Sequence, residues 1–203
     1  METLIKKDTD IFQPGKVYSI EEYLLIEDQS VEKHEFYNGK AIKMPGAKPA
    51  HNLIASNIIT HLNNALENAP KEYFVLNSDS KIHIPRFRNF VYPDAVVVCE
   101  TIELYPGSST VITNPLLIVE VLSPSTEKHD RHSKFNDYKQ IPSFKEYLMV
   151  SQTLPYALAS FKSADRTWED LEAEGLDSTL YLKSVDCTLD LKKIYKGVRF
   201  EMA

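Results

Sequence analysis

The chain has 203 residues, is 43% hydrophobic and carries a formal net charge of −6. This length fits one domain with a real core, and no part of the sequence predicts a second domain. No apolar run is long enough to span a membrane, the polar N-terminus is not a signal peptide, and the two cysteines lack metal-binding spacing. We therefore expect a cytoplasmic protein with reduced thiols and no membrane partner.

Helix-capping residues and turn residues predict the first helix and the first hairpin of the chain. Residues 1–16 are polar and aperiodic, which predicts a loose N-terminal arm ahead of a single domain at 17–203. Ser19 and Glu22 have the spacing of a capping box, which predicts a helix beginning there. Asn38-Gly39 is typical of a type I′ hairpin turn, and this hairpin would place Glu35 on a strand.

The middle of the chain alternates between helical and extended patterns. Apolar residues at four-residue spacing predict a helix at about 50–68. Strands are then expected at 73–76, 81–84, 95–99 and 116–122, a helix with Asp130 as its N-cap, a strand at 146–150, and short strands ending at 194–200.

Glu120 interrupts an apolar run at residues 116–122, which otherwise has the length and composition of a buried strand. Both faces of this strand are apolar, so the alternation of side chains does not explain the charge. Burying an unpaired carboxylate would cost several kcal/mol, so a partner must compensate it. A bound cation is one such partner. An edge position, or an ion pair with Arg or Lys, is the structural alternative.

Asp94 follows Pro93 at the start of the apolar segment 95–99. If this strand is an antiparallel neighbour of 116–122, Asp94 and Glu120 approach one another. Two hard oxygen ligands, with no Cys or His clustered beside them, suit Mg²⁺ or Mn²⁺ better than zinc. For Asp94 alone, capping a turn after proline is the simpler interpretation.

Several segments in one order carry a family resemblance. They are residues 36–44, His51, residues 92–94 (YPD), residues 115–126 (PLLIVEVLSPST), Asp130, Lys134, Tyr138 and residues 141–147 (IPSFKEY). This pattern resembles the Uma-type restriction endonuclease family of the PD-(D/E)XK nuclease superfamily over roughly residues 15–200. The string EVLSPST is its most specific part.

The resemblance implies a restriction-endonuclease-like α/β fold, with a mixed, mainly antiparallel central sheet flanked by helices. It also implies one divalent-metal site, in which Asp94, Glu120 and the Val121 carbonyl bind Mg²⁺ or Mn²⁺ and Glu35 supports the metal through water. The superfamily lysine normally stands two residues beyond the Glu, where this chain has Leu122. By resemblance, Lys134 on the following helix takes its place as the third catalytic residue.

The negative net charge is unusual for a nucleic-acid enzyme, because phosphate binding usually leaves a basic surface. Two short basic clusters, at 81–88 and 128–132, are the exceptions. We therefore expect weak, salt-sensitive binding of DNA, improved by a homodimer. The candidate contacts are His51, Arg86, Arg88, Lys128 and Arg131.

Metal-dependent hydrolysis of phosphodiester bonds is the favoured function. The sequence leaves two alternatives open. Leu122 at the usual lysine position, together with the acidic surface, would suit a non-catalytic module that keeps the nuclease fold and binds nucleic acid or protein. The charge would also suit a hydrolase of small phosphoesters.

Overall fold

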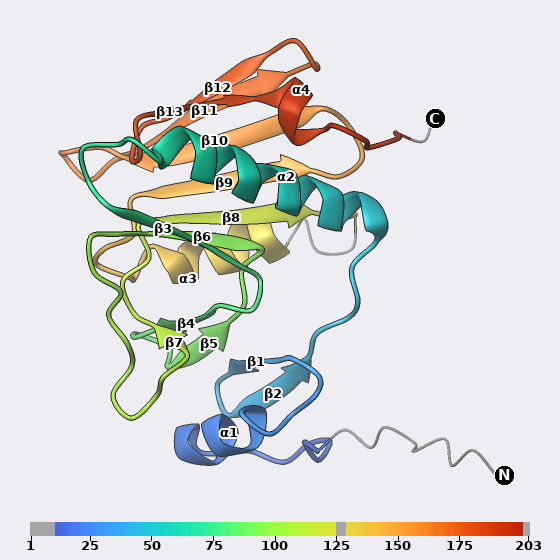
Figure 1. The fold of residues 1–203 in the computed structure, drawn as a ribbon. Coiled ribbons are helices and arrows are strands. Elements are labelled where there is room, and N and C mark those ends of the chain that lie inside the picture. The colour runs from blue at the N-terminus through green and yellow to red at the C-terminus, as the bar shows by residue number, and fades with distance from the viewer. Residues whose placement is uncertain (1–10, 125–128, 201–203) are drawn as a thin grey trace, which may run out of the picture.

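The computed structural model describes residues 11–124 and 129–200, and a six-stranded sheet forms its centre (Figure 1). The strand order is β11–β10–β9–β8–β6–β3, and every neighbouring pair is antiparallel except β8 and β9. The bounds are β3 Tyr73–Asn77, β6 Ala95–Cys99, β8 Leu117–Leu122, β9 Glu146–Ser151, β10 Tyr156–Lys162 and β11 Trp168–Glu174. The predicted mixed, mainly antiparallel sheet is confirmed.

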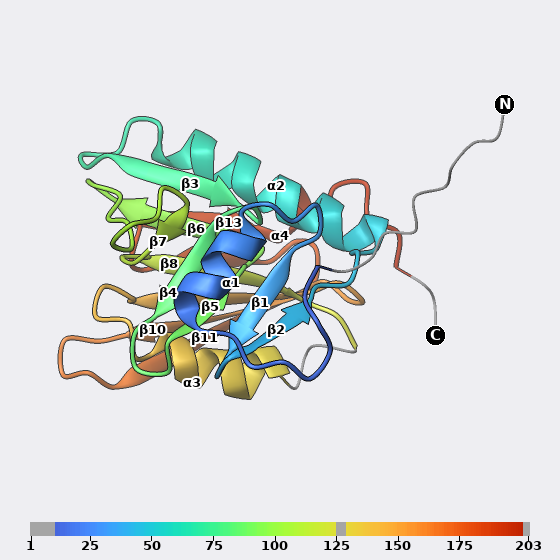
Figure 2. The same cartoon turned by 90° about the horizontal axis from the view of Figure 1, so that it is seen from below.

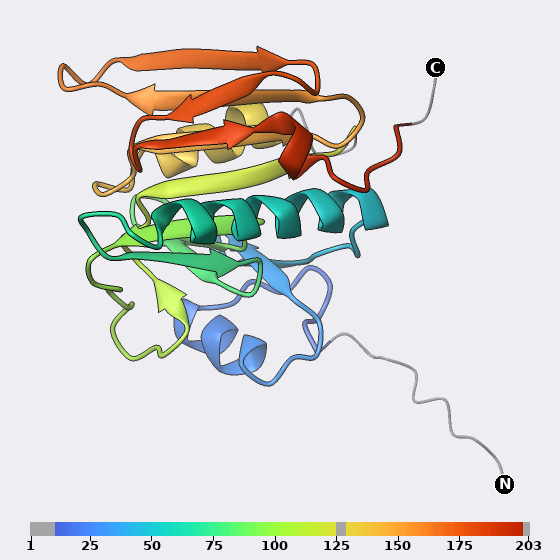
Figure 3. The same ribbon diagram turned by 45° about the horizontal axis from the view of Figure 1, so that its top comes forward.

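Helix α2 (Pro49–Leu66) crosses one face of this sheet (Figure 3). Proline at its first position fits a place where the amide has no partner within the helix. The buried side chains Ile54, Ile58 and Leu62 pack in one apolar cluster with Leu117 and Val119 of β8. The predicted helix at 50–68 is thus confirmed. The same cluster includes side chains from β12 (Thr179–Leu182), β13 (Cys187–Asp190) and α4 (Leu191–Ile194).

The opposite face of the large sheet packs against a short π-helix, η1 (His129–Lys134), and the α-helix that follows it, α3 (Phe135–Tyr138). Ile118 and Leu122 of β8 lie in this second cluster with Tyr138. Side chains on β8 therefore alternate between two apolar layers. Glu120 shares the face of Ile118 and Leu122, which is the face toward α3.

A smaller five-stranded sheet, in the order β2–β1–β5–β4–β7, lies below the large one in Figure 1 and in front of it in Figure 2. Its strands are β1 His34–Tyr37, β2 Lys40–Lys43, β4 Lys81–Ile84, β5 Asn89–Val91 and β7 Val111–Ile112. Helix α1 (Ile20–Glu27) packs on it through Tyr23, whose ring stacks on Phe36 at 4.5 Å between centroids.

Two local predictions in this region are confirmed. The capping box at the start of α1 is complete, because the Ser19 hydroxyl accepts the Glu22 amide and the Glu22 carboxylate accepts the Ser19 amide. The β1–β2 turn has φ values of 47° at Asn38 and 84° at Gly39, as a type I′ turn requires. This hairpin places Glu35 on β1.

The structure differs from the sequence expectations at three points. Asp130 lies inside the π-helix, which begins at His129, so its prediction as an N-cap was wrong. The last described element is α4, and residues 194–200 contain no strand. Within the predicted arm at 1–16, Phe12 is buried against Tyr18 and Tyr23, and residues 1–10 lie outside the described part. Among the described residues, no helix combines the length and apolar character needed to span a bilayer.

Candidate active site

The register between β6 and β8 brings the two predicted carboxylates to one end of the large sheet. Ala95 pairs with Val119 and Val96 with Ile118, so Asp94, one residue before β6, comes beside Glu120. The Asp94 Oδ2 atom accepts the backbone N–H of Val121 at 2.6 Å. The antiparallel arrangement assumed for these strands is thereby confirmed, and Asp94 is fixed to the backbone next to Glu120.

The Val121 carbonyl faces the same place. In a strand, the N–H and C=O groups of one residue point to the same side. The Val121 N–H points to Asp94, and the regular ladder of β6 starts only at Ala95. The carbonyl therefore lies beyond the last ladder bond, on the side of the Asp94 carboxylate.

Glu120 is nearly fully buried, with 4% of its surface exposed. Its Oε1 atom accepts two hydrogen bonds, from the Tyr138 hydroxyl at 2.8 Å and from the Lys134 ammonium at 3.2 Å. Burial raises the pKa of the Glu120 carboxyl from 4.5 to about 8; Lys134 opposes this rise, while the charge of Asp94 adds to it. A second cation beside this carboxylate would therefore stabilise its ionised form.

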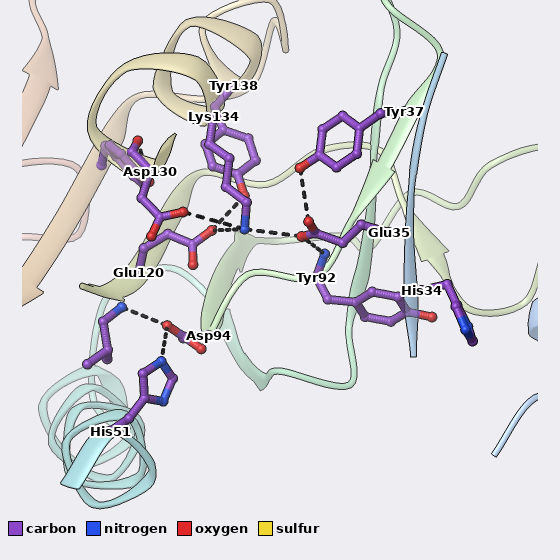
Figure 4. Close-up of polar contacts among 12 residues, drawn as sticks. His34, Glu35, Tyr37, His51, Tyr92, Asp94, Glu120, Asp130, Lys134 and Tyr138 are labelled. Atoms are coloured by element: carbon purple, nitrogen blue, oxygen red, sulfur yellow. Dashed lines mark hydrogen bonds and ion pairs between the residues drawn. The ribbon is translucent and has the colours of Figure 1, made fainter. Parts of the chain in front are cut away.

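The Lys134 ammonium lies at the centre of a group of carboxylates (Figure 4). Its Nζ atom is 3.1 Å from Glu35 Oε1, 3.2 Å from Glu120 Oε1 and 3.8 Å from Asp130 Oδ1. Burial alone would lower the pKa of Lys134, but these anions, with Glu120 first, raise it well above its usual range. Lys134 therefore stays charged. The π-helical turn that carries it is a feature often found at functional sites.

Glu35 is held by groups from η1, from its own strand β1 and from the segment between β5 and β6. Besides Lys134, its Oε1 atom accepts the backbone N–H of Tyr92 at 3.3 Å, and its Oε2 atom accepts the Tyr37 hydroxyl at 3.0 Å. Burial raises the pKa of the Tyr37 hydroxyl, so it remains a donor. Both oxygens of Glu35 are thus directed by donors, and its immediate contact is the catalytic lysine candidate.

His51 lies in the first turn of α2, and its Nε2 atom is 3.2 Å from Asp94 Oδ2. Burial lowers the pKa of His51, but the hydrogen bond and charge of Asp94 outweigh it and the pKa is raised. Each of these two side chains is 16% exposed, more than Glu120 or Lys134. Solvent therefore reaches the site from the side of Asp94 and His51.

The basic candidates lie elsewhere or are not described. Arg86 and Arg88 are in the turn between β4 and β5, where Arg86 donates to Gln140 Oε1 at 3.0 Å. No contact among the described residues joins either arginine to the carboxylates. Lys128 lies outside the described residues, and Arg131 is described only as part of η1.

Three contributors were not identified from the sequence: Tyr37, Tyr92 and Asp130 as neighbours of the charged group. Tyr37 stands two residues from Glu35 on the same strand, so a shared strand face was the available signal. For Asp130 and Lys134, the four-residue spacing within a predicted helix was the available signal. The backbone role of Tyr92 has no such signal, because it depends on the contact between the sheets.

The oxygen donors fit a hard divalent cation. Hydrogen bonds reach only Oδ2 of Asp94 and Oε1 of Glu120, so no described residue donates to Asp94 Oδ1 or Glu120 Oε2. Two carboxylate oxygens and one backbone carbonyl match the ligand preference of Mg²⁺ and Mn²⁺. Within residues 11–124 and 129–200, no three His, Cys, Asp or Glu side chains form a ready-made metal cluster, so the carbonyl and water would complete the ligand set.

The fold and this constellation define a restriction-endonuclease-like α/β protein. The profile of the Uma2 family, described as "Putative restriction endonuclease", matches residues 20–191, and the chain belongs to this family. The resemblance inferred from the sequence is confirmed.

Two curated relatives are similar to this chain in sequence, and one solved structure is similar to it in fold. The chain is 37% identical to the uncharacterized protein slr1290 of Synechocystis sp. over 92% of this chain and 96% of that one. It is 35% identical to sll1609 of the same organism over 75% and 85% of the two chains. Its fold matches the crystal structure of a "putative nuclease belonging to DUF820" from Anabaena variabilis, with a TM-score of 0.67, 14% identity, and coverage of 87% and 96%.

Proposed function

We propose that this protein is a divalent-metal-dependent endonuclease that hydrolyses phosphodiester bonds in DNA. The observation that carries the proposal is the register of β6 and β8, which sets Asp94 beside Glu120 with the Val121 carbonyl between the strand ends. The membership of the chain in the Uma2 family supports it.

In this proposal, Asp94, Glu120 and the Val121 carbonyl hold Mg²⁺ or Mn²⁺. A bound ion of this kind lowers the pKa of a coordinated water and polarises a phosphoryl oxygen. Lys134 stabilises the charge that develops on the phosphate, or orients the attacking water. Its ammonium already lies against Glu120, so no large movement is required.

The surrounding residues position these groups. Tyr138 holds Oε1 of Glu120, which directs the other oxygen away from the lysine. His51 holds Oδ2 of Asp94 in the same way. Glu35 forms an ion pair with Lys134 and so positions its ammonium. We propose that any support Glu35 gives to the metal passes through a water molecule next to that ammonium.

Cleavage of supercoiled plasmid DNA tests the proposal. Wild-type protein should nick the plasmid with Mg²⁺ or Mn²⁺ and should stop when the ion is chelated. Asp94→Asn should lower the rate by about two orders of magnitude or more, because it removes a charged ligand. Asp165→Asn, in an exposed turn of the β10–β11 hairpin, is the matched control and should cleave at the wild-type rate. Equal rates for wild type and Asp94→Asn would contradict the proposed site.

DNA binding should be weak and strongly dependent on salt. If two phosphates are neutralised, binding should weaken about tenfold between roughly 50 and 200 mM salt. Replacing both Arg86 and Arg88 by alanine should flatten this dependence, whereas Lys192→Ala, at an exposed side chain of α4, should leave it unchanged. Binding measured by fluorescence anisotropy over a salt series decides this. A flat salt dependence in the wild type would count against DNA as substrate.

One observation favours a second candidate, a non-catalytic module that binds nucleic acid or protein. The Lys134 ammonium already compensates Glu120, as in a structural ion pair, so the fold does not need a metal to bury this carboxylate. Metal-independent DNA binding without cleavage of any phosphoester would support the module. Cleavage of a small phosphoester in preference to DNA would instead indicate a small-phosphoester hydrolase.

A further inference from the structure

The two outer edges of the large sheet differ in charge. Strand β11 forms one edge and has four acidic residues among seven: Glu169, Asp170, Glu172 and Glu174. Such charges prevent an edge strand from pairing with another chain. Strand β3 forms the other edge, with the sequence YFVLN. It has no charged residue, no proline and no glycine, so it lacks these protections.

The side of β3 that faces away from β6 carries backbone N–H and C=O groups that could pair with another strand. The Glu100 amide donates to the Glu72 carbonyl, so the even-numbered residues of this segment direct their peptide groups to β6. By alternation, Tyr73, Val75 and Asn77 direct theirs outward. Within the described part of the chain, only the Asn77 carbonyl has a partner on that side, the amide of Ser80.

We propose that this edge is a homodimer interface, in which β3 of two copies pair antiparallel about a twofold axis at Val75. In this register Val75 faces Val75 of the second copy and exchanges two hydrogen bonds with it. Tyr73 faces Asn77. The two large sheets then join into one continuous sheet through their uncharged edges.

Charges at the ends of the segment fix this register. Lys71 lies two residues before β3 and Asp79 lies in the turn two residues after it, so antiparallel pairing about Val75 brings Lys71 toward Asp79 of the second copy, and the symmetry makes this approach twice. Lys71 is exposed, and Asp79 keeps 73% of its side chain exposed while paired with Lys33. Opposite charges facing each other across strands are favourable, and like charges are unfavourable. The segment is therefore complementary to itself, which favours a second copy over an unrelated strand.

The surface beside the edge can receive the second copy. An open groove of about 580 Å³ runs between the C-terminal end of α2 and β3, lined by Asn63, Glu67, Tyr73 and Val75 among others. Tyr73 and Val75 are only partly buried, and they pack on the same cluster as α2. In the pair, the same side chains of the second copy lie on this face and cover them.

Light scattering coupled to size exclusion tests the proposal over a concentration series. Wild-type protein should be dimeric, and Lys71→Asp should weaken the dimer several-fold because Asp79 then faces a like charge twice. Lys71→Arg is the matched control and should remain dimeric. Because Lys71 is exposed, these substitutions do not threaten the fold. A wild-type monomer at every concentration would overturn the proposal.

A crosslink tests the axis itself. Facing residues of a hydrogen-bonded antiparallel pair have Cα atoms about 5.5 Å apart, within the range for a disulfide. Val75→Cys should therefore form covalent dimers under mild oxidation. Wild-type protein, which carries Cys99 and Cys187, controls for the native thiols. A dimer that neither crosslinks at position 75 nor responds to Lys71→Asp would place the interface elsewhere, and the pairing of β3 would be wrong.

Discussion

Replacing Lys134 by alanine is expected to cause the largest loss of stability of any substitution at this site. Glu35, Glu120 and Asp130 would remain buried around a lost ammonium. Removing one partner of a buried ion pair costs about 3–5 kcal/mol. For a chain of this length, the melting temperature should fall by roughly 6–20 °C. Calorimetry or circular dichroism measures it.

The pH dependence of this loss has a definite sign. The pKa of Glu120 in the folded state is raised to about 8, so protonation of Glu120 favours folding. This contribution is complete below the ordinary pKa of 4.5 and is lost as the pH rises through about 8. Without the ammonium, ionised Glu120 has no compensating cation. The Lys134→Ala protein should therefore approach wild type in acid and fall furthest behind it above pH 8.

Lys139→Ala is the control for this experiment. The Lys139 ammonium lies 3.8 Å from the centre of the Phe135 ring, next to the same helix, and among the described residues no carboxylate forms an ion pair with it, although the charge of Asp170 acts on its pKa. Its loss should cost only about 1 kcal/mol. If the two alanine variants melted at the same temperature, the carboxylates around Lys134 would not depend on it for compensation.

The second large effect is the rise in melting temperature that a divalent metal ion should cause. Mg²⁺ or Mn²⁺ at about a hundred times its dissociation constant should stabilise the folded protein by about 2.7 kcal/mol, which raises the melting temperature by roughly 5–10 °C. Glu120→Gln should abolish this rise, because it removes a charged ligand and the repulsion between Glu120 and Asp94 that the ion relieves.

A buried glutamate on the neighbouring strand gives the matched control. Glu146 is fully buried at the start of β9, where it accepts the amides of Lys183 and Ser184. It pairs with Leu117, the first residue of β8, and so lies away from the end that carries Glu120. Glu146→Gln should keep the metal-induced rise, even if it melts lower without metal. A rise that persists in Glu120→Gln would remove Glu120 from the ligand set.

The site on the central strands could be predicted because a charged side chain is unfavourable in a buried apolar strand. A carboxylate within an apolar strand has few explanations, so Glu120 could be singled out, and Asp94 followed once the strands were taken as antiparallel neighbours. The hairpin at Asn38-Gly39 and helix α2 were predictable for a local reason, since turn residues and four-residue spacing act over short distances.

Other features could not be predicted because they depend on distant contacts. Strands β5 and β7 have three and two residues, too few for an alternating pattern, and they exist through pairing with β1 and β4. The π-helical turn that holds Asp130 near Lys134 has no sequence signature. The hydrogen bonds of Glu35 likewise arise where the small sheet meets the large one.

The location of bound Mn²⁺ tests the central claim most directly. Crystals grown with Mn²⁺ should show an anomalous scattering peak within coordination distance of Asp94 Oδ1, Glu120 Oε2 and the Val121 carbonyl, with water as the remaining ligands. The same crystals of Asp94→Asn should lack the peak. A peak at another place, or no peak in wild-type crystals at saturating Mn²⁺, would contradict a metal site between these strands.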